Sequence, residues 1–300
     1  SFTVFSGAWA TFALELFDDS KAMCAAAANC SAARLRNMVV LAIESPSYML
    51  SWQPPAIEPT VVASTRLPDA GMAPFQLPYP TSAHFDAARG MPPAPSLARR
   101  KALAALVANA VRHDANGSSS VDGTIAPWAI GRGPLRALLH AECARAGSSQ
   151  CLARGGKRGG SFIWNTNNET FAAYQSAVFC LQPWGDSATR KGFWDALLAG
   201  CINVIFDDAG WNETDAWFGD HRQWTVRVPL AELGNERGGA LGYLRALPRA
   251  RVERLHAAVR AVRGRIQYAI DGGTPGGDGV DVIVRRVAEH FERRKEHSSQ

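Results

Sequence analysis

Two short segments combine glycine with basic residues immediately before a stretch that is typical of a helix. The first, G-R-G-P, begins with Gly131 and Arg132, and the second, G-D-S-A-T-R-K, begins with Gly185 and ends with Arg190 and Lys191. The start of a helix offers unpaired N–H groups and partial positive charge, glycine allows close approach to the backbone, and arginine or lysine adds full charge. Both junctions are therefore candidate sites for a diphosphate.

A carboxylate follows the second junction at a distance that suits a nucleotide. Asp195 lies one to two turns into the expected helix, where it could accept both hydroxyls of a ribose, as acidic residues do in other nucleotide-binding folds. The same residue stands four positions after Lys191, so an ion pair within the helix explains it equally simply. Spacing alone favours this second interpretation, with Arg190 and Lys191 forming a solvated first turn.

Alternating apolar strands and helices must position these junctions. The pattern predicts a strand over residues 177–181, a helix over 190–199 ended by Gly200 in the left-handed conformation, and a buried strand over 201–206. Further strands are expected over 38–43, 125–130 and 161–164, and further helices over 97–112, 135–146, 170–176, 252–266 and 280–291. This repeat predicts an α/β fold with a parallel sheet that binds ligands at the carboxyl ends of its strands.

The polar segment 114–123 is the expected internal boundary. It would separate an N-terminal domain over residues 1–122 from a C-terminal domain over 123–275, with a final helix and tail over 276–300.

The composition is that of a globular protein. The 300 residues are 47% hydrophobic and 20% charged, with a net charge of +5, which excludes a disordered, collagen-like or coiled-coil chain. The basic excess is too small and too scattered to indicate nucleic-acid binding. The chain opens at Ser1 with neither a signal pattern nor an apolar run long enough to cross a bilayer, so we expect a soluble protein or one whose targeting segment is missing.

Cysteines and glycosylation sequons together favour an oxidising secretory compartment. The six cysteines fall into three pairs close in sequence: Cys24 and Cys30, Cys143 and Cys151, and Cys180 and Cys201. Such pairs are easily bridged, although buried free thiols remain an alternative. Four N-x-S/T sequons occur, at Asn29, Asn116, Asn168 and Asn212.

The string over residues 179–206, FCLQPWGDSATRKGFWDALLAGCINVIF, closely resembles the signature of exostosin-family glycosyltransferases. The resemblance is to the plant and algal branch, which is similar to xyloglucan galactosyltransferases. The segment 77–85, LPYPTSAHF, looks like the family's V-P-Y-P-T-x-x-H-P element. Weaker similarities at residues 41–44, at Cys143 with Cys151, and at residues 247–254 extend the match to roughly residues 35–295.

The resemblance implies a GT-B type architecture, with two Rossmann-like halves facing across a cleft and an N-terminal half that is incomplete here. The C-terminal half would hold a UDP-sugar and the N-terminal half the acceptor, which would be a polysaccharide or a glycoprotein glycan. Family members are type II membrane proteins of the Golgi lumen that invert the anomeric centre. The membrane anchor would lie outside this chain, and the protein could form homo- or hetero-oligomers with related enzymes.

The resemblance also implies roles for individual residues. Arg190 and Lys191 would neutralise the departing diphosphate, and Asp195 would hold the ribose. Gly131 and Arg132 match the first junction of the C-terminal half only loosely. The loop before Arg190 would supply backbone donors and one aromatic ring for stacking on the donor; its candidate residues are Trp184, Gly185, Asp186, Ser187 and Thr189.

Two positions depart from the family pattern. Gly192 stands where many relatives have an arginine three residues before the acidic residue, and Asn203 stands where proline is usual. The first departure bears on the role that the family's arginine plays, because glycine at position 192 carries no charge. The second is expected to alter only the end of the strand.

The sequence contains no D-x-D triplet, so cationic side chains rather than a metal ion are expected to stabilise the leaving group, and no cofactor is predicted. The candidates for the general base are Glu44 and His84, each of which could equally be a structural hydrogen bonder. The alternative function is that of a non-catalytic relative, a lectin or a scaffolding partner of an active glycosyltransferase.

Overall fold

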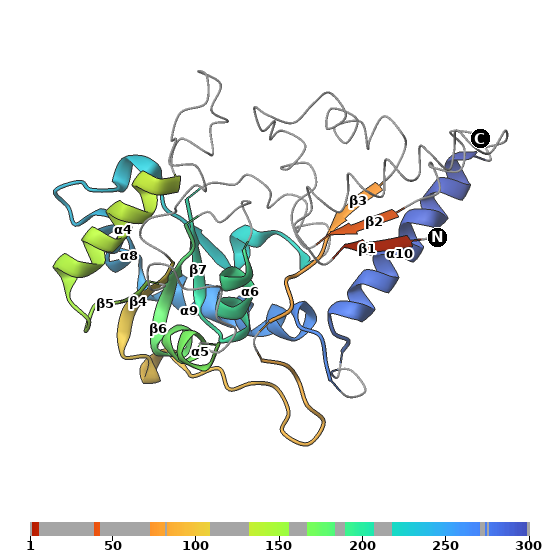
Figure 1. Ribbon diagram of the computed structural model, residues 1–300, viewed down its shortest axis with the longest axis horizontal. Helices are drawn as coiled ribbons and strands as arrows, with labels where there is room; N and C mark the ends of the chain where they lie inside the picture. Colours follow the sequence, from red (N-terminus) through yellow and green to blue (C-terminus); the bar gives the residue numbers. More distant parts are fainter. Residues whose placement is uncertain are drawn as a thin grey trace.

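The protein contains two parallel sheets, seen as separate groups of strands in a computed structural model (Figure 1). The residues that the structure describes are 2–5, 39–42, 73–81, 83–108, 132–155, 167–183, 190–206, 218–270, 274 and 276–298. The smaller sheet has the order β1-β2-β3, and its strands are Phe2–Phe5, Val39–Ala42 and Ala73–Gln76. The α/β class is confirmed, and two parallel sheets are consistent with a GT-B type fold.

The larger sheet has five parallel strands in the order β5-β4-β6-β7-β8. Its strands in chain order are β4 (Ala102–Val107), β5 (Cys151–Arg154), β6 (Ala177–Leu181), β7 (Ile202–Ile205) and β8 (Thr225–Arg227). After β5 the chain returns past β4, so the winding direction reverses between β4 and β6. In doubly wound sheets the carboxyl ends of the strands at this switch point are where ligands bind.

The prediction of a helix over residues 97–112 is wrong. The structure has a short 3-10 helix, η2 (Leu97–Arg99), followed by β4. Leu106 packs in one core cluster and Ala105 in the other, so β4 is buried on both faces and shows no polar alternation. An apolar run of alanine and leucine fits a helix by propensity, but pairing with β5 and β6 decides in favour of a strand. The larger sheet therefore begins before the boundary expected at residue 123.

Most of the other expected elements are present. The strand over 177–181 has the expected bounds, and Gly200, which follows the C-cap residue of α6, has a φ of 77°. Strands β5 and β8 were not predicted, and the strands expected over 125–130 and 161–164 lie outside the described residues. The helices are α4 (Arg132–Ala146), α5 (Asn167–Ser176), α6 (Lys191–Leu198), α8 (Gly239–Arg245), α9 (Arg249–Val262) and α10 (Gly279–Ser298), with short 3-10 helices η4 (His221–Gln223), η5 (Leu230–Glu232) and η6 (Arg263–Ile266).

Two of the three expected cysteine pairs are disulfides. Cys143 of α4 is joined to Cys151 of β5, and Cys180 of β6 is joined to Cys201 just before β7. Free thiols are therefore excluded at these four positions, whereas Cys24 and Cys30 lie outside the described residues. No helix within the described ranges is both long and apolar enough to span a membrane.

Arg100 links several elements by hydrogen bonds near the amino ends of the strands in the larger sheet. Its buried guanidinium donates hydrogen bonds to the carbonyl oxygens of Tyr174, Ala177, Ala199 and Gly200, at distances of 2.6–3.1 Å. These carbonyls lie at the end of α5, the start of β6 and the turn after α6. Burial, with a smaller contribution from the nearby Arg263, lowers the pKa of Arg100 to about 10, so it remains a cation at neutral pH.

Candidate functional site

Arg190 lies between the carboxyl ends of β4 and β6, at the switch point of the larger sheet. Its Nη2 donates to the carbonyl oxygen of Val107, the last residue of β4, at 2.7 Å. Nη2 and Nε also donate to Oε1 of Gln182, the residue that follows β6, at 2.9 and 3.2 Å. Because Arg190 is also the extended N-cap residue of α6, its cation and the start of that helix occupy the same region.

The amide of Gln182 is itself held in place by a buried network. Its Nε2 donates to Oδ1 of Asn203 at 2.9 Å and to the carbonyl oxygen of Gly192 at 3.3 Å. Asn203 in turn donates from Nδ2 to the carbonyl oxygen of Phe193 at 2.9 Å, and its side chain is fully buried within β7. The expectation that Asn203 alters only the end of a strand is therefore wrong, because this side chain links β7, Gln182 and the first turn of α6.

Gly192 leaves room for the guanidinium of Arg190. A Cβ atom at this position would lie 2.7 Å from the hydroxyl oxygen of Tyr174, 3.0 Å from Nη2 of Arg190 and 3.2 Å from its Cζ. Tyr174 comes from α5 and is fully buried. Burial raises the pKa of its hydroxyl to about 12, although the Arg190 cation opposes this rise, so the hydroxyl is neutral at neutral pH.

Lys191 and Asp195 form an ion pair within α6. The Nζ of Lys191 lies 2.6 Å from Oδ2 of Asp195, and the two side chains are 29% and 4% exposed, respectively. The ion-pair interpretation that the spacing left open is therefore confirmed. Lys191 thus occupies Oδ2 of the carboxylate that was expected to bind the ribose.

The structure brings together only part of the predicted site. Lys191 and Asp195 pair with each other within α6, and Arg190 is the N-cap residue of the same helix. Arg132 is the first residue of α4, but its side chain is outside the described part of the chain. The remaining candidates also lie outside the described residues: Glu44, Gly131, Trp184, Gly185, Asp186, Ser187 and Thr189.

His84 has a hydrogen-bonding role in the structure. Its Nδ1 lies 2.8 Å from the carbonyl oxygen of Tyr268, which can only accept, so Nδ1 carries the proton. The hydroxyl of Tyr268 donates to the carbonyl oxygen of Pro78, and the N–H of Phe85 donates to Oε1 of Gln267, each at 2.8 Å. These hydrogen bonds hold Pro78, His84 and Phe85 against Gln267 and Tyr268, which follow η6. The same hydrogen bond leaves Nε2 of a neutral His84 unprotonated.

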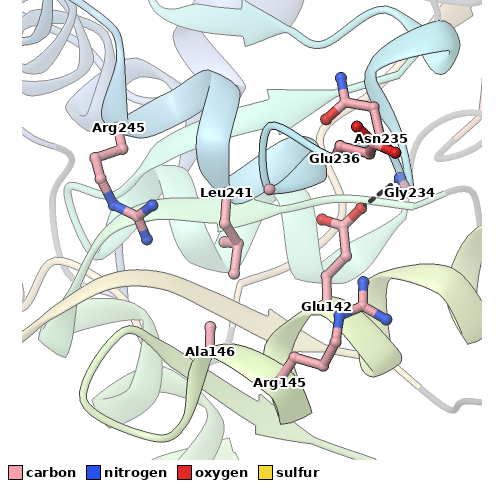
Figure 2. Close-up of a pocket in the computed structure, with 9 residues that line it drawn as sticks. Glu142, Arg145, Ala146, Gly234, Asn235, Glu236, Leu241 and Arg245 are labelled. Carbon is pink, nitrogen blue, oxygen red and sulfur yellow. Dashed lines mark hydrogen bonds between the residues drawn. The ribbon is translucent and has the colours of Figure 1, made fainter.

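A pocket of about 420 Å³ lies between α4 and α8 (Figure 2). Its buried carboxylate, that of Glu142, accepts hydrogen bonds from the backbone N–H groups of Gly234 and Ala240, both at 2.9 Å. Arg145 and Arg245, which are both exposed, also line the pocket. Glu142 thus caps the amino end of α8, which is a structural role. Among the described residues, no group of three or more histidines, cysteines or acidic residues could hold a metal ion.

Comparison with known proteins supports the same region. The exostosin GT47 domain matches residues 26–237 of the chain, which include β2 to β8 and the whole Arg190 network. Among relatives, the probable xyloglucan galactosyltransferase GT12 of Arabidopsis thaliana is 32% identical over 47% of this chain and 29% of its own length. The xyloglucan galactosyltransferase MUR3 of the same plant is 28% identical over 41% of this chain and 21% of its own length.

A third Arabidopsis thaliana relative, xyloglucan-specific galacturonosyltransferase 1, is 34% identical over 34% of this chain and 15% of its own length. The chain thus spans less than a third of the length of these relatives. A solved structure described as the glycotransferase of kitacinnamycin is 15% identical, covers 75% of this chain and 50% of its own, and has a TM-score of 0.31, which is too low to support an argument about the fold. The signature around Arg190, the parallel sheet that carries it and the match over residues 26–237 lead to one conclusion: the chain belongs to the exostosin GT47 family.

Proposed function

We propose that this chain forms part of an inverting glycosyltransferase that transfers a sugar from a UDP-sugar to a polysaccharide or a glycoprotein glycan. The observation that carries the proposal is the Arg190 guanidinium at the switch point, beside the start of α6. The names of the three relatives share xyloglucan but differ between galactosyl and galacturonosyl transfer. Xyloglucan is therefore the acceptor to test first, with both donor sugars.

Arg190 acts on the leaving group. Cleavage of the bond between the anomeric carbon and UDP places additional negative charge on the diphosphate, so a cation already held in position lowers the barrier. The hydrogen bonds that Arg190 makes to described residues use Nε and Nη2, which leaves Nη1 to donate to a phosphate oxygen. The loop residues Gly185, Asp186, Ser187 and Thr189 would add backbone donors.

The ion pair between Lys191 and Asp195 limits how strongly these two residues can bind the donor. With the pair closed, Lys191 contributes to the positive potential only weakly, because Asp195 offsets its charge. Binding of a diphosphate would compete with Asp195 for Lys191, and the freed carboxylate could then accept the ribose hydroxyls. Donor binding and opening of this pair are thus coupled in the proposal.

The acceptor hydroxyl needs a base. His84 has an unprotonated Nε2 when its ring is neutral, and Glu44 remains the other candidate. The reaction is proposed to proceed without a metal ion. We place the full-length protein in the Golgi lumen, anchored by a segment outside this chain; two disulfides support an oxidising compartment.

UDP release from UDP-galactose and from UDP-galacturonic acid, with xyloglucan oligosaccharide present, tests this function. Removing a positioned donor to a developing oxyanion costs roughly 10²–10³ in turnover, so Arg190→Ala should lower turnover by this amount. Arg249→Ala is the matched control, since that side chain is 92% exposed and pairs with Glu253 along α9. Retained turnover in Arg190→Ala would refute the proposed role, and loss of turnover on adding EDTA would refute metal independence.

A non-catalytic role, as a lectin or a scaffolding partner, is favoured by one observation. Lys191 and Asp195, two of the expected donor contacts, already satisfy each other in the structure. In that case the chain would bind xyloglucan oligosaccharide while neither binding UDP nor releasing it from any UDP-sugar.

A further inference from the structure

We propose that Gln182 and Asn203 are positioning residues that orient the Arg190 guanidinium toward the diphosphate. This inference rests on the proposed function, because it concerns the group that would meet the leaving phosphate. Neither residue was among the candidates derived from the sequence.

The geometry around Arg190 shows why Gln182 controls the guanidinium. A free arginine side chain has several rotatable bonds and populates many orientations. Here the Oε1 atom of Gln182 accepts hydrogen bonds from both Nε and Nη2 of Arg190. The carbonyl oxygen of Val107 accepts a further hydrogen bond from Nη2. Together these contacts fix the plane of the guanidinium and the direction of Nη1.

Asn203 determines which end of the Gln182 amide faces Arg190. Its Oδ1 accepts from Nε2 of Gln182, and its own Nδ2 is committed to the carbonyl oxygen of Phe193. An amide flipped the other way would bring the Nε2 donor of Gln182 against the Arg190 donors and its oxygen against Oδ1 of Asn203. Only one orientation therefore satisfies the network.

The choice of an amide over a carboxylate also matters. A glutamate at position 182 would still accept from Arg190, but it would neutralise the guanidinium and leave less positive charge for a phosphate, and its second oxygen would face Oδ1 of Asn203. The neutral amide of Gln182 holds the guanidinium without offsetting its charge. The network thus combines a fixed orientation with an undiminished charge.

The test is a double-mutant cycle on the affinity for UDP, measured by titration calorimetry on the 300-residue chain. Gln182→Met keeps the approximate volume but removes the oxygen that receives Arg190. We expect it to weaken UDP binding by about tenfold, the effect of one well-oriented hydrogen bond to a charged group, and by less than twofold in the Arg190→Ala background. A purely structural role would give the same loss in both backgrounds, and that result would overturn the proposal.

The matched control is Gln175→Met, because Gln175 donates to the carbonyl oxygen of Pro93 rather than to the site. It should leave the UDP affinity unchanged. Asn203→Ala is a second variant, for use if Gln182→Met fails to fold, and it should weaken UDP binding severalfold in the same background-dependent way.

A measurement without ligand separates this inference from the proposed function. In the NMR spectrum of the free protein, the Nε–H signal of Arg190, assigned by its absence in Arg190→Ala, should exchange slowly with water. Exchange should accelerate at least tenfold in Gln182→Met but stay slow in Gln182→Glu, which should nevertheless bind UDP more weakly than wild type. If wild type binds no UDP, the proposed function fails, and equal exchange in wild type and Gln182→Met would overturn the positioning role independently.

Discussion

Replacing Gly192 by alanine tests whether the start of α6 is shaped around Arg190. The added Cβ would lie 2.7 Å from the hydroxyl oxygen of Tyr174, a contact that requires something to move. The Tyr174 ring is fully buried and cannot give way, whereas the flexible Arg190 side chain, at 3.0 Å, can. We therefore expect alanine to displace either α6 or Arg190.

Two opposing effects determine how much Gly192→Ala changes the free energy of unfolding. Overpacking of a buried site costs about 1–3 kcal/mol, while replacing glycine by alanine in a helix returns up to about 1 kcal/mol. The expected net destabilisation is about 1 kcal/mol, within a range of about 0–2 kcal/mol. Removing the hydroxyl oxygen with Tyr174→Phe takes away the nearest contact, so the same alanine should then be neutral or slightly stabilising.

Urea denaturation of wild type, both single variants and the double variant gives the stability cycle, and UDP titration of the same four proteins gives the functional one. Stability should recover in the Gly192→Ala, Tyr174→Phe double variant, but UDP affinity should not, because the added Cβ would still lie 3.0 Å from Nη2 of the flexible Arg190 side chain. Gly264→Ala is the control, since a Cβ there would meet no atom within 4 Å. An equal cost of Gly192→Ala with tyrosine and with phenylalanine at position 174 would refute the steric reasoning.

Three further results are expected from unfolding measurements. Arg100→Met should cost about 3–5 kcal/mol because several buried carbonyls lose their donor, whereas the exposed neighbour Arg99→Met should change stability by less than about 0.5 kcal/mol. Burial, aided by nearby arginines, lowers the pKa of His256 to about 4, so the unfolded chain binds more protons between pH 6.5 and 4 and stability falls as the pH drops through this range. His256→Phe should remove about 1 kcal/mol of that loss at pH 5, solvent screening included, and an unchanged pH profile would contradict this cause. Replacing Cys180 and Cys201 by alanine opens a link across 21 positions and should cost about 3 kcal/mol, and dithiothreitol should lower the stability of wild type by at least this amount, because it also reduces the Cys143–Cys151 disulfide.

Local patterns in the sequence predicted much of the larger sheet. The strand β6, the helix α6 and the left-handed Gly200 follow from apolar periodicity and a helix stop signal, which act over a few residues. The two observed disulfides also join cysteines that are close in the chain. The family signature belongs to the same stretch, so it placed Arg190 at the start of α6.

By itself, then, the sequence determined the α/β class, the parallel sheet, the family and the cation at the start of α6. The tertiary structure alone decided that β4 is a strand, because burial on both of its faces depends on β5, β6 and the helices that cover them. It also decided how Arg190 is held, since Val107 lies 83 positions earlier and Asn203 reaches the site only through the pairing of β6 with β7. Contacts of this kind depend on how distant segments pack, and no local pattern of residues encodes them.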